Sequence, residues 1–482
     1  MHKYLPLVLI LLCSGCSLAP KYEQPAAPVA QTFPSGPAYE EVAFTQEAIP
    51  EWQEFFINEK VKKAIALGLE NNRDFRVAAL NVEKAKAAYG IQRAPLLPSV
   101  AGGLTENASR TPGTLSNTGT SVVQHTYQAN LATTSWELDF FGRIRSLSEA
   151  ALQQYFATEE AKYAAQVALI GEIASAWLNL GTQKELLRLA EVTLKSQEES
   201  FTLMQASFRL GAASELDLEQ ARTTVESAKA SKAMYQRTLA QARNALDLLI
   251  GTTLPPELEP QGIEVVTTQA AIMPAGLPST ILLQRPDIRQ AENQLKAANA
   301  NIGAARANFF PRISLTAGVG TGSRDLGDLF DGGTGLWSFA PSISLPIFTG
   351  GANLATLRQA EAEEKIMVAQ YEKAIQTAFA EVADAMATKG TVTRQTEALK
   401  RLMNATTRAY NLSMSRYKNG LDGFLTVLES QRQMVQSQTN YIQSEQQRIN
   451  ALIQLYKVLG GGAPKVEDEP VTKEQVAMGG EG

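Results

Sequence analysis

Apolar positions along this 482-residue chain follow two different periods, and the longer one is helical. From Ile144 to about Leu210 the sequence has no proline, and within this run apolar or small residues recur every three or four positions, with Gln183 as the one polar exception. The members of this stripe are Leu169, Ile173, Ala176, Leu180, Leu187, Ala190 and Leu194. The spacing predicts one continuous helix with a coiled-coil seam, on the order of 100 Å long at about 1.5 Å per residue. Helices of this length must pack along one another in an elongated body.

Other segments alternate between apolar and polar residues, which is the period of a β-strand. The members of the more apolar face are Val123, His125, Tyr127, Ala129 and Leu131; Ile313, Leu315, Ala317 and Val319; and Trp337, Phe339, Ile343, Leu345 and Ile347. The loops between the strands, 106–121 and 322–335, are rich in glycine, serine, threonine and asparagine. Alternating segments of about ten residues are typical of transmembrane β-strands. A soluble β-sandwich with one wet face is the alternative interpretation.

The predicted number of strands, four in each chain, is too small to close a barrel. A sheet in lipid cannot keep open edges, because each unpaired backbone group costs several kcal/mol in hydrocarbon. We therefore expect the sheet to close with copies of itself. Two copies would give a barrel with a filled interior, whereas three would give twelve strands and room for a lumen. The polar inner face favours three.

The chain contains an internal duplication. Residues 73–98 align without gaps with residues 286–311 at an offset of 213, and nine aligned positions are identical. Each copy continues through two strands into long helices. We expect two homologous halves, 61–251 and 280–460, joined by an equatorial linker, 252–279, and followed by a polar tail, 461–482.

The N-terminus has the features of a secretory signal peptide over residues 1–15: a short basic start, an apolar stretch and small residues. The ending Ser14-Gly15-Cys16 resembles a bacterial lipobox, which implies that Cys16 becomes the lipidated first residue of an anchored segment, 16–60. Ser17 then implies sorting to the outer membrane, by resemblance to enterobacterial lipoproteins. The alternative is ordinary signal cleavage that leaves Cys16 as a free thiol.

Composition excludes several classes of function. With two cysteines and two histidines, the chain is a poor candidate for a thiol- or imidazole-rich metal, haem or iron–sulfur site. A net charge of −5 gives no basic footprint for nucleic acid. No interior run approaches the roughly 20 apolar residues of a transmembrane helix. No motif for phosphate binding or nucleophilic catalysis stands in a suitable context. We expect no enzyme, no cofactor and no metal.

Two turns interrupt the long helical runs at corresponding places. Gly211 and Gly420 each follow a long helix, and each fits the left-handed C-terminal cap that favours glycine. Ser214 and Asp217 have the spacing of a capping box that begins the next helix.

Several motifs together resemble the outer-membrane factors of tripartite efflux systems, the TolC family, and most closely its OprM-like lipoprotein branch. They are Gly15-Cys16-Ser-Leu-Ala-Pro-Lys-Tyr, Glu137-Leu-Asp-Phe-Phe-Gly-Arg143, Arg285-Pro-Asp-Ile-Arg289, Ala297-Ala-Asn-Ala-Asn-Ile-Gly-Ala-Ala-Arg306, Leu345-Pro-Ile-Phe348, Arg416-Tyr-Lys-Asn-Gly420 and Leu428-Glu-Ser-Gln-Arg432. The resemblance covers nearly the whole chain after Cys16.

This resemblance implies a mixed fold formed by a homotrimer. A twelve-stranded β-barrel in the outer membrane continues into a long α-helical barrel, with most of the mass in the periplasm. It implies a passive exit duct for drugs or other small toxic compounds. Its expected partners are a periplasmic adaptor (a membrane fusion protein), an inner-membrane pump of the resistance–nodulation–division type and outer-membrane lipid.

The resemblance also assigns roles to residues near the two turns. It places the adaptor-contact tips at Leu210, Gly211, Ala212, Asn419, Gly420 and Leu421. It places a periplasmic gate at Asp217, Tyr417, Asp422, Leu425 and Glu429. TolC itself carries an arginine where this chain has Asp422, and an acidic residue where it has Thr426, so the closing contacts are expected to differ.

Within this gate, Leu425 and Glu429 are four residues apart and therefore share one helical face. A trimer would place three leucines and three carboxylates in rings, and the carboxylate ring fits a cation-selective constriction. Repulsion between the carboxylates opposes closure. We expect the leucine ring to hold the gate closed, together with a bond from the Tyr417 hydroxyl to Asp217. The alternative is a core leucine and a solvated glutamate without a gating role.

Three other functions compete with the efflux duct. Two are channels of the same family, namely the exit channel of a type I protein secretion system and a heavy-metal efflux duct. The third is a coiled-coil lipoprotein spacer without a pore. Lipidation and the similarity to the OprM-like branch favour efflux over protein secretion, and the alternating strands argue against the spacer.

Overall fold

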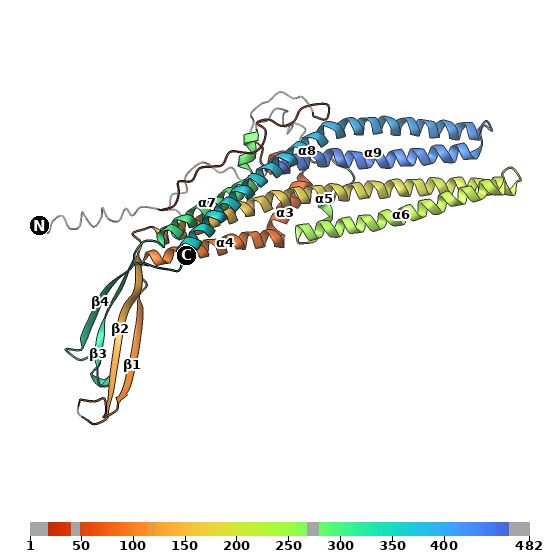
Figure 1. Ribbon diagram of the computed structural model, residues 1–482. Helices are drawn as coiled ribbons and strands as arrows, with labels where there is room; N and C mark the ends of the chain where they lie inside the picture. Colours follow the sequence, from red (N-terminus) through yellow and green to blue (C-terminus); the bar gives the residue numbers. More distant parts are fainter. Residues whose placement is uncertain (1–17, 40–48, 118, 268–278, 462–482) are drawn as a thin grey trace. The chain divides into compact units, whose positions relative to one another are not determined.

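The computed structural model describes residues 18–39, 49–117, 119–267 and 279–461. They form mainly helices and one β-sheet (Figure 1). The chain divides into two compact units. The sheet unit comprises Met1–Ala26, Asn81–Glu159 and Gln290–Glu372. The helix unit comprises Ala27–Leu80, Glu160–Arg289 and Lys373–Gly482.

The order of elements repeats along the chain. The helices are α2 (Trp52–Phe55), α3 (Glu59–Asn71), α4 (Arg73–Arg93), α5 (Arg143–Arg209), α6 (Glu215–Ile250), α7 (Pro286–Ala307), α8 (Ala352–Lys418) and α9 (Phe424–Val458). The strands are β1 (Ala101–Thr111), β2 (Val122–Leu138), β3 (Arg312–Ser323) and β4 (Gly335–Ser344). The predicted long helix is confirmed as α5, and α8 has the same length of 67 residues. The helices α4 and α7 begin at the aligned positions Arg73 and Pro286.

The four strands form one antiparallel sheet in the order β1-β2-β3-β4 (Figure 1). The alternation predicted for the strands is confirmed by the register, which aligns apolar side chains in rows across one face. One such row is Leu131, Val319 and Trp337. The opposite face carries small and polar residues. They include Asn130, Ala132, Gly318, Gly320, Ser338 and Ser342. The sheet therefore has one apolar and one polar face.

A β-bulge in β2 changes the alternation between Thr133 and Trp136. Ser135 has a φ of 51°, which is unusual for a residue other than glycine. Trp136 then lies opposite Leu315, on the same apolar face as the odd-numbered residues before the bulge. Because one extra residue restores the face, the apolar surface continues to the end of the strand.

Some predicted strand limits are wrong. The loops are shorter than 106–121 and 322–335, because β1 continues to Thr111 and β3 to Ser323. The polar residues at the ends of β1 and β3 are paired with neighbouring strands. Their polar composition is typical of loops, so composition alone placed the strand ends too early. Leu345 and Ile347 follow the end of β4 at Ser344, where Pro346 lacks the N–H that a further strand bond would need.

The hydrophobic core of the helix unit surrounds Trp177 of α5, which is fully buried and donates from Nε1 to the carbonyl of Leu258 at 2.8 Å. Residues of α3, α5, α6 and α9 pack around it. Leu169, Ile173 and Leu180 of the predicted seam are buried in this core. The ring of Phe55 stacks on Tyr456, with centroids 3.9 Å apart. The helical stripe therefore serves packing, as its spacing predicted.

In the sheet unit, an extended N-terminal segment runs along α7 and contacts α8. The carbonyls of Leu18 and Pro20 accept hydrogen bonds from Arg306 and Asn299 at 3.2 and 2.9 Å. Gln24 donates to the Tyr371 hydroxyl at 2.9 Å. Cys16, the predicted lipid-bearing residue, lies outside the described residues. The first described residue, Leu18, is thus held at the last turn of α7, just before β3 begins.

Candidate gate and docking tips

The turn between α5 and α6 is a closed helix cap. Gly211 has a φ of +74°, and its N–H donates to the carbonyl of Phe208 at 2.9 Å. The N–H of Ala212 donates to the carbonyl of Ser207 at 2.8 Å, which completes a Schellman motif. Leu210 is 84% exposed at the end of the turn. The predicted left-handed glycine cap is confirmed, and it presents an apolar side chain to solvent in this chain.

The turn between α8 and α9 has the same geometry. Gly420 has a φ of +71°, and its N–H donates to the carbonyl of Tyr417 at 2.9 Å. The N–H of Leu421 donates to the carbonyl of Arg416 at 2.9 Å. Leu421 is 65% exposed. The two turns are therefore matched in backbone conformation and in the apolar residue that they expose.

One hydrophobic cluster joins the two turns, which lie at the same end of the helix unit (Figure 1). Its buried members are Met204, Leu218, Ala221, Phe424 and Val427. Tyr417 packs against the cluster, and its ring lies 5.4 Å from the ring of Phe424. Both tips therefore pack on one common hydrophobic cluster.

The structure does not form the expected bond between Tyr417 and Asp217 within the described part of one chain. The Asp217 carboxylate instead accepts hydrogen bonds from the backbone N–H and the hydroxyl of Ser214, at 3.2 and 2.7 Å. This is the predicted capping box, which is confirmed. The short aspartate side chain is thus directed to the N-terminus of its own helix.

Asp422 has a partner that the sequence interpretation missed. Its carboxylate accepts two hydrogen bonds from the Arg416 guanidinium, at 2.7 and 3.0 Å. The pair bridges the turn from the last turn of α8 to the residue before Gly423, the N-cap of α9. The hydrogen bond from Arg416 lowers the pKa of Asp422 below its ordinary value. The only signal in the sequence was an arginine six residues before an aspartate across a glycine turn.

Leu425 and Glu429 share one face of α9, as their spacing predicted, and both are exposed in this chain. The Leu425 side chain is 63% exposed. Glu429 accepts hydrogen bonds from Arg432 at 2.5 Å and from Gln433 at 2.9 Å. Arg432 was not among the predicted gate residues, although an arginine three positions after a glutamate is the usual spacing of a helical ion pair. Each carboxylate of the predicted ring therefore carries its own countercharge.

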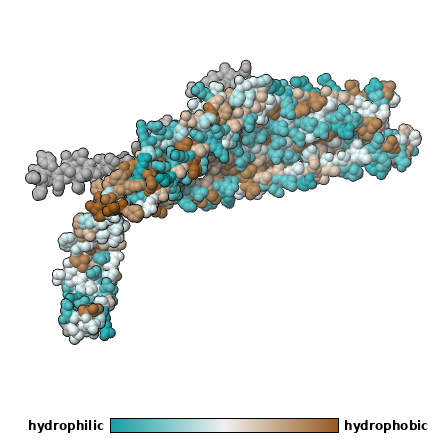
Figure 2. All heavy atoms as spheres, in the orientation of Figure 1, coloured by the Kyte–Doolittle hydropathy of each residue, from teal (hydrophilic) through white to brown (hydrophobic). Residues whose placement is uncertain are grey.

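The sheet offers a second functional surface, its apolar face. Large side chains along it are exposed in this chain: Leu131 56%, Val319 61%, Trp337 79%, Phe339 62% and Ile343 71%. Figure 2 shows hydrophobic side chains gathered where the strands meet the helices of the sheet unit, and hydrophilic ones toward the loops at the other end of the sheet. Exposed apolar patches of this kind mark a surface that contacts lipid or protein.

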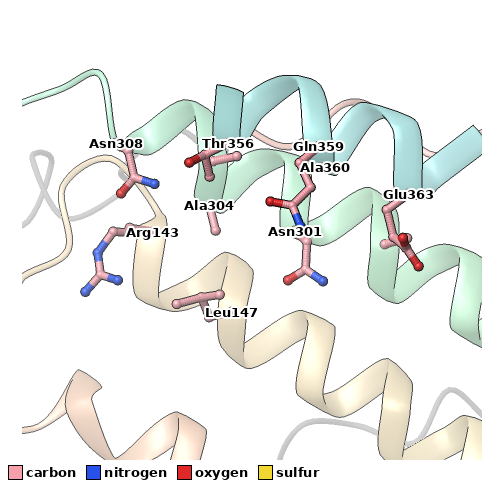
Figure 3. Close-up of a pocket in the computed structure, with 11 residues that line it drawn as sticks. Arg143, Leu147, Asn301, Ala304, Asn308, Thr356, Gln359, Ala360 and Glu363 are labelled. Carbon is pink, nitrogen blue, oxygen red and sulfur yellow. The ribbon is translucent and has the colours of Figure 1, made fainter. Parts of the chain in front are cut away.

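The motif that joins β2 to α5 is structural. The Arg143 guanidinium donates two hydrogen bonds to Glu137, at 2.9 and 2.7 Å, and the backbone N–H of Arg145 donates to Asp139 at 2.8 Å. Beside this junction α5, α7 and α8 line an open cavity of about 360 Å³. Figure 3 shows Arg143 and Asn308 at one end of this cavity and Glu363 at the other. Because Arg143 is already paired, the cavity offers no free cation for an anionic ligand.

Within the described ranges, no group of histidine, cysteine, aspartate and glutamate side chains could hold a metal ion. Among the helices of these ranges, none is both long and apolar enough to cross a membrane.

Solved structures with this fold define a class of outer-membrane channels. The chain matches the open state of the Neisseria gonorrhoeae MtrE outer membrane channel with a TM-score of 0.84 and 40% identity, covering 93% of this chain and 99% of that one. It matches a membrane protein from Pseudomonas aeruginosa with a TM-score of 0.86 and 42% identity, covering 92% of this chain and 100% of that one.

The chain belongs to the outer membrane efflux protein family, whose model matches residues 64–252 and 277–461. Among its relatives, the solvent efflux pump outer membrane protein SrpC of Pseudomonas putida is 47% identical over 463 residues, covering 95% of this chain and 98% of the relative. The outer membrane protein OprJ of Pseudomonas aeruginosa is 42% identical over 456 residues, covering 95% of both chains. The family resemblance of the motifs is thereby confirmed. The protein is an outer-membrane efflux channel protein and not an enzyme.

Proposed function

We propose that three copies of this chain form a twelve-stranded barrel in the outer membrane, which serves as the exit duct of a tripartite efflux pump. The observation that carries the proposal is the sheet with an exposed apolar face and two open edges, β1 and β4. In hydrocarbon each unpaired backbone group on these edges would cost several kcal/mol. Pairing β4 of one copy with β1 of the next keeps the strands antiparallel and removes every open edge.

The polar face supports three copies over two. A barrel of about eight strands has an interior that side chains must fill. Glycine, serine and alanine dominate the corresponding positions here, for example Gly318, Gly320, Ser338 and Ala340. Such small side chains leave the interior of a small barrel empty, whereas they line the wider lumen of twelve strands without blocking it.

The height of the apolar face is close to that of a membrane. On β3 the apolar face extends from Ile313 through Val319 to Thr321. Ile313 is paired with Leu138 and Ile343, and Val319 with Leu131 and Trp337. Eight residue steps span about 27 Å along a strand, or about 21 Å when the strand is tilted by about 40°. The apolar band of outer-membrane barrels is about 25 Å tall. The match supports lipid as the occupant of this face.

The N-terminus is proposed as a second anchor, with Cys16 bearing acyl chains after removal of residues 1–15. Leu18, two residues later, is bonded to Arg306 at the end of α7, and β3 begins at Arg312. The acyl chains would therefore enter the membrane near the start of a strand. Acyl burial contributes about 0.8 kcal/mol per CH₂, so several chains give a stable anchor.

The helices with their two tips are proposed to extend into the periplasm and to dock a periplasmic adaptor. The exposed Leu210 and Leu421 on rigid glycine turns support this role, because each gives a partner an apolar contact at a fixed place. An inner-membrane pump of the resistance–nodulation–division type would complete the assembly. Relatives named for solvent, toluene and antibiotic efflux support small organic compounds as cargo.

The gate is proposed at the face of α9 that carries Leu425 and Glu429. In a trimer the three Leu425 side chains would meet on the axis and bury the surface that one chain leaves exposed. The other predicted gate residues would hold the turns beside this face in place. Tyr417 packs on Phe424, and Asp422 is paired with Arg416. Asp217 caps the start of α6. Any bond between Tyr417 and Asp217 would have to form between neighbouring chains.

Two measurements test the channel itself. The mass of the detergent-solubilised protein should be that of a trimer, and the purified protein should conduct ions across a planar lipid bilayer. A dominant monomer or dimer would refute the twelve-stranded barrel. Absence of conductance under all conditions would instead support the non-channel spacer. Secretion of a folded or unfolded protein substrate through the channel would favour the type I secretion role.

A third measurement tests the gate. Leu425→Ala should raise the open conductance and make cells more sensitive to large antibiotics such as vancomycin, because the constriction loses its apolar ring. Leu412→Ala, at another exposed leucine of 66% exposure on α8, is the matched control and should change neither. Equal conductance in both variants would mean that Leu425 does not line the constriction.

A further inference from the structure

A groove in the helix unit adjoins the proposed gate, with which it shares Leu425 and Glu429. It lies between α5, α6 and α9 and has a volume of about 590 Å³. Leu189, Leu428 and Val435 give it apolar walls, and Gln197 and Gln431 bring primary amides to the same space. Small-molecule sites usually measure about 300–1,000 Å³ and combine apolar walls with a few polar groups. In size and lining, this groove resembles such a site.

The two amides are buried and incompletely paired. Gln431 is 3% exposed and Gln197 is 7% exposed. The Oε1 atom of Gln197 accepts a hydrogen bond from the Thr224 hydroxyl at 2.8 Å, which leaves its NH₂ group available. Throughout the described part of the chain, no hydrogen bond involves the Gln431 side chain. Neither amide is among the described side-chain groups that are both fully buried and unpaired, so the free N–H and C=O groups reach the solvent of the groove, where a ligand can pair with them.

The charges at the groove narrow the class of ligand. Its charged lining residues, Glu429 and Arg432, are paired with each other at 2.5 Å. A site without uncompensated charge gives an ion no advantage over water, whereas it can bind a neutral molecule by apolar contact and hydrogen bonds. The ligand must therefore supply an apolar body together with donors and acceptors for the two amides.

We propose that this groove binds a neutral, drug-sized amphiphile whose amide or hydroxyl groups pair with Gln431 and Gln197. The identity of this ligand as exported cargo rests on the proposed function, although the geometry of the groove does not. Since Leu425 and Glu429 also line the groove, the ligand would bind beside the proposed gate. The wall of the duct would then hold its cargo briefly near the constriction.

The test is direct binding of chloramphenicol to the full-length protein in lipid nanodiscs, measured by isothermal titration calorimetry against empty nanodiscs. This probe is neutral and carries an aromatic ring, hydroxyls and an amide. We expect saturable binding, and Gln431→Leu should weaken it about five- to tenfold, as loss of one or two hydrogen bonds does. Gln205→Leu, at an exposed amide of α5 outside the groove, should leave the affinity unchanged.

A second variant avoids the buried amide, in case Gln431→Leu does not fold. Ser227→Phe fills the groove from an exposed position of α6 and should abolish binding. Ala230→Phe adds the same ring to an exposed neighbour that does not line the groove, and binding should persist. No saturable binding, or equal binding by both phenylalanine variants, would overturn the proposal, as would a structure with only water on Gln431.

Channel conductance separates this inference from the proposed function. Wild-type protein that conducts ions in a planar bilayer but does not bind the probe would refute the binding groove alone. Protein that binds the probe through Gln431 but never conducts would refute the duct and leave the groove in place.

Discussion

Exchange of Glu429 for glutamine should give the proposed constriction a net positive charge. In each chain Arg432 donates to Glu429 at 2.5 Å, so the wild-type ring contains three compensated pairs and should discriminate little between ions. Glu429→Gln removes three negative charges and leaves three arginines. Arg432→Gln does the opposite and leaves three carboxylates. The two variants should therefore shift ion selectivity in opposite directions, to anions and to cations respectively.

The size of the shift follows from the geometry of a trimeric ring. Charges about 7 Å apart lie about 4 Å from the axis, where each acts on a monovalent ion with about 1 kcal/mol in water. Three charges give about 3 kcal/mol before screening, and every 1.4 kcal/mol corresponds to about a tenfold ratio. At about 0.1 M salt the Debye length of about 10 Å exceeds the ring radius, so at least a tenfold change in permeability ratio should remain. At about 1 M it falls to about 3 Å and the effect should shrink.

The assay is the reversal potential of single channels in a planar bilayer under a salt gradient. Glu185→Gln, in the Glu185–Arg188 ion pair of the same spacing on α5, is the control and should not change it. If neither Glu429→Gln nor Arg432→Gln moves the reversal potential while both channels conduct normally, this face of α9 does not line the pore. A shift to cations in Glu429→Gln would contradict the charge compensation by Arg432.

Four further predictions concern the anchor, the tips and the core. Cys16→Ala should abolish incorporation of radioactive palmitate and slow delivery to the outer membrane without preventing folding, since the barrel inserts independently. If the Cys16→Ala protein is still labelled, Cys16 is not the lipidated residue. Gly420→Val should destabilise its tip by about 1–2 kcal/mol, because a β-branched residue disfavours the positive φ, and it should lower drug resistance in cells while conductance in purified protein persists; unchanged resistance would exclude the tip from docking. Because Arg416 lowers the pKa of Asp422, their ion pair should stabilise the α8–α9 turn at pH values above the ordinary pKa of aspartate, and this stabilisation should be lost as the pH falls through the lowered pKa. Hydrogen exchange, corrected for its intrinsic pH dependence, should show less protection of that turn in Asp422→Asn protein than in wild type at pH about 6. In strong acid the two proteins should be equally protected. Trp177→Ala should lower the free energy of unfolding by about 3–5 kcal/mol in chemical denaturation, whereas Trp337→Ala on the exposed sheet face should change it far less.

The sequence by itself determined the elements whose signal is local. Helical spacing from Leu169 to Leu194, inside a run without proline, predicted α5, because an apolar stripe at that period is typical of a helix. Gly211 and Gly420 predicted the two caps, since the positive φ of each turn favours glycine over other residues. The spacing of Ser214 and Asp217 predicted the capping box for the same local reason. Motif resemblance supplied the family, and with it the roles of tips and gate, which stay predictions.

Tertiary structure decided whatever depends on which segments meet. The ends of β1 and β3 were misplaced, because cross-strand partners and not composition determine where pairing stops. The bulge at Ser135 restores the apolar face by one extra residue, which a fixed period of two cannot anticipate. Arg416 reaches Asp422 only because the glycine turn brings residues six positions apart together, whereas the spacing of Glu429 and Arg432 was already that of a helical ion pair. The sequence shows which residues are charged, but the fold determines which of them lie close enough to form ion pairs.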